Sequence, residues 1–243
     1  MIDYIRAIKR PFTDIKKLMI GILLSLPIPL VTIVTNTIAL GYVFNCGRTA
    51  KESNYDLPEW KNYGKLWFNA IVAGIIGFIY MIPVIIIIFI FAKDFAMAYA
   101  NDKTTLLLNI STNPAGLINI YGIGILFVWL SSIIIGYFVP IAMLNWIITG
   151  KFGSAFDFGD ISKKVFTRKY FDVWLTLTII GIIISFVTVK FFPLDMLQDP
   201  KSILLEANLI KFIIFVIIIS TIDFVENVFT YTLYGNVLEE LKK

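Results

Sequence analysis

Two carboxylates inside an apolar stretch are the residues whose types and spacing could do chemistry. Asp223 and Glu226 lie three residues apart within 212–238, so they occupy neighbouring positions if that stretch is one helix. An ionised carboxylate deep in a bilayer is costly, so its position needs an explanation. We therefore expect the pair to face a bundle interior, to carry a proton or to bind a cation, which would suit a proton or cation relay.

A polar stripe accompanies the two acids. The residues at steps of three or four are Ser220, Asp223, Asn227, Thr230 and Tyr234. Together with Glu226 they form a candidate intramembrane polar site. The alternative is that the acids only hold helices together, or lie near the interface. A transport path would need polar partners on other spans, and Asn36, Asn69 and Asn145 are the candidates.

The chain contains no histidine and a single cysteine, Cys46. This composition excludes His/Cys zinc sites, Ser-His-Asp triads and Cys-His dyads. We therefore predict no catalytic residue, no metal ligand and no cofactor, and the sequence leans away from an enzyme.

Composition indicates the class of protein in which the polar stripe lies. Hydrophobic residues make up 58% of the 243 residues, and the mean hydropathy is +0.83. These values are typical of an integral membrane protein. We expect an all-α, polytopic membrane bundle forming one domain over 1–243. The four predicted long spans are 66–92, 118–150, 173–189 and 212–238. The basic residues flank these spans, so we predict membrane lipids rather than nucleic acid as partners.

A further uncharged stretch, 18–46, is interrupted by Leu26-Pro27-Ile28-Pro29. One straight helix of this length would reach about 44 Å, against a hydrocarbon core of about 30 Å. If the stretch is instead a hairpin, 16 of the 21 Lys and Arg residues lie on one side of the membrane. The positive-inside rule therefore favours a hairpin, either re-entrant or crossing twice, in a multi-pass protein of the cell membrane with both termini cytoplasmic.

Three segments are predicted to lie on the cytoplasmic surface. The amphipathic N-terminal segment, 1–17, alternates apolar and basic residues, and Pro11 should end its helix. Asp56-Leu57-Pro58-Glu59 has the pattern of a capping box, so a helix should begin there, with Trp60 at the interface. The third segment carries a basic cluster that either contacts anionic lipid or only follows the positive-inside rule: Lys163, Lys164, Arg168 and Lys169.

Short aromatic motifs resemble a known family. They are Gly41-Tyr42, Leu57-Pro58-Glu59-Trp60, Tyr80 to Pro83, and Ala155-Phe156 followed by Tyr170 and Trp174. These motifs resemble a prokaryotic, largely archaeal family of membrane proteins known as domain of unknown function 4013. The resemblance covers most of the chain and implies a polytopic membrane protein without an established activity.

The preferred interpretation is a non-enzymatic scaffold or accessory subunit that binds lipid or another membrane protein. The alternative is a small transporter or channel that uses Asp223 and Glu226. An intramembrane enzyme acting on lipid phosphates ranks third, because its acids lack the spacing of a metal cluster.

Overall fold

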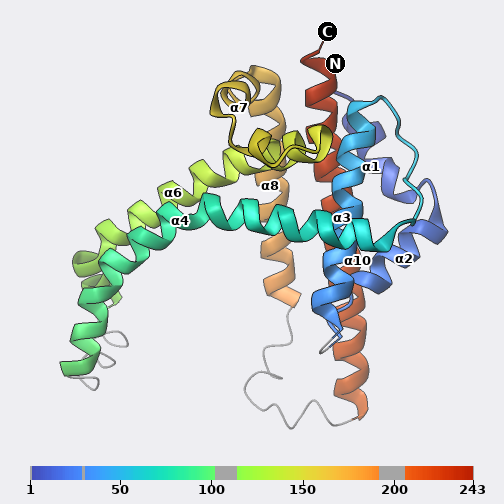
Figure 1. Ribbon diagram of the computed structural model, residues 1–243. Helices are drawn as coiled ribbons and strands as arrows, with labels where there is room; N and C mark the ends of the chain where they lie inside the picture. The colour runs from blue at the N-terminus through green and yellow to red at the C-terminus, as the bar shows by residue number, and fades with distance from the viewer. Residues whose placement is uncertain (1, 29–30, 102–113, 192–205, 243) are drawn as a thin grey trace. The chain divides into compact units, whose positions relative to one another are not determined.

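The computed structural model describes residues 2–28, 31–101, 114–191 and 206–242. Every regular element in these ranges is helical, so the predicted all-α fold is confirmed (Figure 1). The elements in order are α1 (Tyr4–Lys9), η1 (Arg10–Phe12), α2 (Ile15–Ser25), α3 (Thr32–Lys51), α4 (Tyr63–Asn101), α6 (Pro114–Thr149), η2 (Phe152–Phe156), α7 (Phe158–Val165), α8 (Arg168–Phe191) and α10 (Glu206–Glu240).

Four of these helices are long and apolar enough to cross a membrane. The apolar lengths are Tyr63–Phe91 in α4, Gly122–Thr149 in α6, Arg168–Phe191 in α8 and Asn208–Glu240 in α10. They coincide with the four predicted spans to within a few residues at most ends. Pro83 and Pro140 lie inside α4 and α6, as the sequence places them.

The chain forms two compact units. Unit 1 comprises Met1–Ala73 and Pro140–Lys243, and unit 2 comprises Gly74–Val139. Both boundaries fall inside long helices, because α4 and α6 each contribute to both units. The single membrane domain expected from the sequence stays a prediction.

The predicted break in 18–46 is present and separates α2 from α3. Leu26 adopts an extended conformation directly before Pro27, as a residue before proline prefers. The 11 residues of α2 reach only about 16 Å, roughly half the hydrocarbon core. The 20-residue α3 extends beyond the predicted end of the hairpin, to Lys51. The two helices pack against each other, which gives the hairpin its core.

Unit 1 is built around the contact of α3 with α10, and glycines permit the close approach of α3 to both α10 and α4. A Cβ atom on Gly235 would lie 2.2 Å from the carbonyl oxygen of Gly47. On the other side of α3, a Cβ on Gly41 would lie 2.0 Å from the carbonyl oxygen of Leu66 in α4. Backbones can approach this closely only where side chains are missing.

The helix expected from Asp56 is not formed, and this prediction was wrong. The chain from Asn54 to Asn62 is not helical, and α4 begins only at Tyr63. Trp60 is buried, at 9% exposure, rather than on the protein surface, and its depth in the membrane stays a prediction. Tertiary contacts account for both differences: the Glu59 carboxylate pairs with Lys17 at 2.8 Å, and the Trp60 indole donates to the Lys17 carbonyl at 3.0 Å.

Unit 2 consists of the apolar middle of α4 and most of the apolar length of α6. Gly124 of α6 lies against the Phe91 ring of α4, and Phe91 stacks on Phe127 with ring centroids 6.3 Å apart. Large apolar side chains on these helices are exposed, including Phe89 at 73% and Ile123 at 68%. Such a surface is typical of helices that contact lipid.

Candidate functional site

The residues of the predicted polar stripe lie on α10 but differ in how far they are buried. Ser220 and Tyr234 are buried, Asn227 is half-buried, and Asp223 is exposed on the helix surface. The Asn227 side-chain amide donates to the backbone carbonyl of Asp223 at 2.8 Å. Thr230 is half-buried on the same helix.

Asp223 and Glu226 have different neighbours in the structure. Glu226 lies beside Gly181 of α8, where an added Cβ would be 3.5 Å from its Oε1 atom. Asp223 instead borders a small cavity of about 20 Å³ between α10 and the hairpin. The residues lining this cavity are Ser25, Asn36, Ala39, Leu40, Val43, Asp223, Phe224 and Asn227. It has room for about one water molecule, and it brings Asn36, one of the three predicted partners, to the stripe.

The predicted basic cluster is divided between two places. Arg168 is almost fully exposed and lies 3.8 Å from Asp172, and the Lys169 ammonium lies 3.1 Å from Glu240. Lys163 and Lys164 of α7 instead line a recess of about 350 Å³. The other residues lining it are Lys51, Asp160, Leu238, Leu241 and Lys242. We call this set of seven residues the lysine recess.

One acid of the lysine recess and one amide beside it fix the position of Lys164. The carboxylate of Asp160 pairs with Lys164 and accepts a hydrogen bond of 2.9 Å from the Asn145 amide. Lys164 also donates to the Asn145 side-chain oxygen at 2.7 Å. Asn145 therefore serves this recess and not the polar stripe. Asp157 caps α7 by accepting from the backbone N–H of Asp160, which fixes the first turn.

Arg10 is a buried residue that sequence reasoning missed. Its side chain is 0% exposed, and its guanidinium donates to three backbone carbonyls and two hydroxyls. The acceptors are the carbonyls of Cys46 (2.7 Å), Asn54 (3.3 Å) and Asp56 (3.0 Å) and the hydroxyls of Thr49 (2.6 Å) and Thr232 (3.0 Å). Desolvation by burial lowers the pKa of Arg10.

The motif residues meet beside Arg10. The Tyr42 ring stacks on Trp60 with centroids 3.7 Å apart, and the Tyr42 hydroxyl donates to the Pro58 carbonyl at 2.9 Å. Burial raises the pKa of Tyr42, so this hydroxyl remains a donor. Lys17 donates to the Leu57 carbonyl at 2.9 Å. These contacts fasten the N-terminal segment and the chain after α3 to one end of the hairpin.

The buried thiol has no reactive character. Burial raises the pKa of Cys46 to about 12, which keeps it protonated at neutral pH. Within the described ranges, no three His, Cys, Asp or Glu side chains are grouped so that they could hold a metal ion.

Comparison with known proteins gives one match. The model of a family described as "Protein of unknown function (DUF4013)" matches residues 20–192. No curated protein and no solved structure shows significant similarity to the chain.

Proposed function

The chain belongs to this family of proteins of unknown function, and from that premise we propose that it is a non-enzymatic, multi-pass protein of the cell membrane that binds anionic lipids. In this role it acts as a scaffold or accessory subunit, and a partner membrane protein can bind to the same charged end. The prokaryotic and largely archaeal origin implied by the resemblance stays a prediction.

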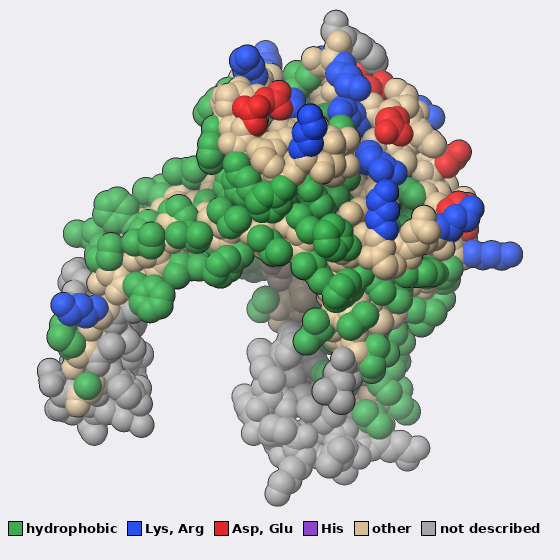
Figure 2. Space-filling view, viewed as in Figure 1, with side chains coloured by type: hydrophobic (Ala, Val, Ile, Leu, Met, Phe, Trp, Pro, Cys, Tyr) green, Lys and Arg blue, Asp and Glu red, His purple; other side chains and the backbone are tan. Residues whose placement is uncertain are grey.

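The observation that carries this proposal is the gathering of basic segments at one end of unit 1. Arg10 joins the N-terminal segment to the chain after α3 and to Thr232 near the end of α10. Lys169, at the start of α8, pairs with Glu240 at the end of α10. Figure 2 shows the charged side chains of this unit crowded at that end, above a surface of apolar side chains.

This distribution suits an anionic membrane surface. Basic residues next to membrane spans are attracted to anionic head groups by about 1 kcal/mol each. The apolar side chains that α1 and α7 leave exposed, such as Ile5, Ile8 and Phe158, can enter the interface beside them. The positive-inside rule places this end, and with it both termini, in the cytoplasm.

Lipid analysis of the purified protein tests the proposal. The protein is extracted in mild detergent, and the lipids and proteins that remain bound are identified by mass spectrometry. We expect anionic lipids to be enriched over their share of the source membrane. Bound lipid with the same composition as that membrane would contradict the proposal.

The transporter alternative is favoured by one observation, the cavity shared by Asp223, Asn36 and Asn227. If Asp223 and Glu226 carry protons or cations, Asp223→Asn with Glu226→Gln should abolish flux in liposomes while the protein still folds. If the acids only stabilise helix packing, this pair of substitutions should be tolerated, whereas leucine at both positions should be destabilising. We expect the second pattern, and loss of a wild-type flux in the amide variant would overturn it.

A further inference from the structure

We propose that the lysine recess is a binding site for a phosphate monoester group, carried either by a lipid or by a soluble molecule. This inference rests on the proposed function in assigning the recess to the charged, membrane-facing end of the protein. It goes further by naming a site and the chemical class of its ligand.

The charge of the recess is strongly unbalanced. Four lysines line it, at positions 51, 163, 164 and 242, together with one acid, Asp160. Asp160 is already paired with Lys164. In the described part of the chain, the ammonium groups of Lys51, Lys163 and Lys242 have no ion pair or hydrogen bond. About three positive charges of the recess therefore have no ion-paired acid among the described residues.

The like charges are held together by the fold. Lys51 ends α3, Lys163 and Lys164 lie on α7, and Lys242 follows α10. The pKa of Lys51 is lowered, first by desolvation and then by the charges of Lys242 and Lys164. A bound anion would remove this repulsion, so the free protein carries a cost that the ligand relieves.

The number and type of donors favour a phosphate monoester over a diester. A monoester carries a charge of about −1.5 to −2 at neutral pH, because its second pKa is about 6. A diester carries a single charge and leaves more of the excess uncompensated. Lysine ammonium groups act as compact point charges that can each approach a different phosphate oxygen.

The remaining walls of the recess indicate how the phosphate is carried. Leu238 and Leu241 give it an apolar side next to the amines. The glycerol and first acyl carbons of a lipid could lie against these side chains, whereas a free phosphate would leave them uncovered. The volume of about 350 Å³ is within the range of small-ligand sites.

A binding series on the full chain in neutral detergent tests the inference. The probes are dioctanoyl phosphatidic acid, dioctanoyl phosphatidylglycerol and glycerol 3-phosphate, and native mass spectrometry gives their Kd values. We expect phosphatidic acid to bind at least tenfold more tightly than phosphatidylglycerol. Tight binding of glycerol 3-phosphate would also support a monoester site, but would identify the ligand as soluble and count against the lipid scaffold.

Two variants place the binding in the recess. Lys51→Met and Lys242→Met should each weaken phosphatidic acid binding about tenfold, whereas Lys61→Met, at an exposed position outside the recess, should leave it unchanged. Lys51→Met should also keep or raise Tm without ligand, because it removes the repulsion. This distinguishes a loss of binding from a loss of folding.

The two proposals can fail separately. Equal affinity for the two lipids, or equal effects of Lys51→Met and Lys61→Met, would overturn the phosphate site even if anionic lipids copurify with the protein. Absence of anionic lipid enrichment, together with tight binding of glycerol 3-phosphate, would overturn the lipid scaffold and support the site.

Discussion

At the scale of single residues, unit 1 contains a buried cation, Arg10, that forms no ion pair with an acid in the described part of the chain. Buried arginines are usually matched by carboxylates. Arg10 is instead surrounded by neutral oxygens from α3, the chain after it and α10. The Arg10 side chain therefore links three segments that are distant in the sequence by hydrogen bonds.

We predict that Arg10→Ala destabilises the protein by about 2–4 kcal/mol, because the carbonyls of Asn54 and Asp56 lose their donor. Arg10→Lys should be more stable than Arg10→Ala but less stable than wild type, because an ammonium group cannot reach all five acceptors. Thermal unfolding in detergent measures the effect. Lys9→Ala, on the exposed side of the same segment, is the control and should change stability by less than about 0.5 kcal/mol. Equal effects at positions 9 and 10 would rule out this role for Arg10.

A second residue-scale prediction concerns pH. Hydrogen bonds to the Lys17 backbone and side chain lower the pKa values of the Asp14 and Glu59 carboxyls below their ordinary 3.8 and 4.5. Because these folded-state values are lowered, their stabilisation is present above about pH 4.5 and is lost as the pH falls through them. The pKa of Lys17 is raised above 10.5, so its share is lost only at higher pH.

Glu59→Gln should therefore lower Tm slightly at pH 7, and the difference from wild type should shrink as the pH is lowered from 4.5 towards 3, because the wild-type carboxyl becomes protonated. Melting curves over this range measure the difference. A gap that stays constant down to pH 3 would show that the Lys17–Glu59 pair does not contribute.

Sequence reasoning could find costly groups but not their partners. Asp223 and Glu226 were identifiable because a carboxylate in an apolar stretch is unusual in itself. Arg10 carried no such signal, because a basic residue in a basic amphipathic segment is ordinary. Its partner Thr232 lies 222 residues away. Lys51 and Lys242 were missed in the same way, since only the packing of α3 and α10 brings them to α7.

At the scale of elements, hydropathy and proline predicted most of the helices. The break at Leu26-Pro27 and the four long apolar helices follow from local properties of the chain. The non-helical conformation of residues 54–62 did not follow from these local properties. Their capping-box pattern competes with the Tyr42 stack and the Lys17 contacts, and those contacts hold Trp60 in the core.

The packing of α3 against α10 gives a prediction at this scale. In Gly235→Ala, the new methyl group would meet the Gly47 carbonyl at 2.2 Å, so the helices must separate. We expect a loss of about 1–3 kcal/mol. Gly64→Ala, where the added carbon has nothing within 4 Å, is the matched control and should be neutral or slightly stabilising. Thermal unfolding in detergent compares them, and equal Tm values would show that the backbones can move apart without cost.

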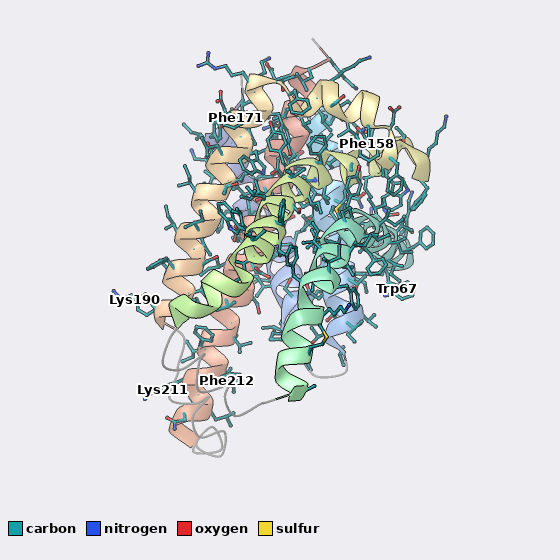
Figure 3. All side chains as sticks on the ribbon, turned by 90° about the vertical axis from the view of Figure 1, so that its left-hand side faces the viewer. Trp67, Phe158, Phe171, Lys190, Lys211 and Phe212 are labelled. Carbon is teal, nitrogen blue, oxygen red and sulfur yellow. The ribbon has the colours of Figure 1, made fainter. Side chains whose placement is uncertain are left out.

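At the scale of the molecule, unit 1 is polarised between two ends. The N-terminal segment, the chain after α3, α7 and the end of α10 share one end through Arg10, Lys169 and the lysine recess. Figure 3 shows Lys190 and Lys211 on α8 and α10 far from Phe158 and Phe171, which lie at that shared end. The contacts of unit 1 thus group most of the segments that the count of basic residues assigns to one side.

This polarity leads to the topological prediction. Tags at the N- and C-termini should both be protected from external protease in intact cells or spheroplasts, because the segments around them meet at one end and carry most of the positive charge. A tag inserted within 104–113, a predicted outer loop that lies outside the described residues, should be cleaved. Permeabilised cells are the control: the protease should cut all three tags there, which shows that none of the tags resists cleavage by itself. Termini on opposite sides would break the hairpin hypothesis, because α2 and α3 would then have to cross the membrane an odd number of times.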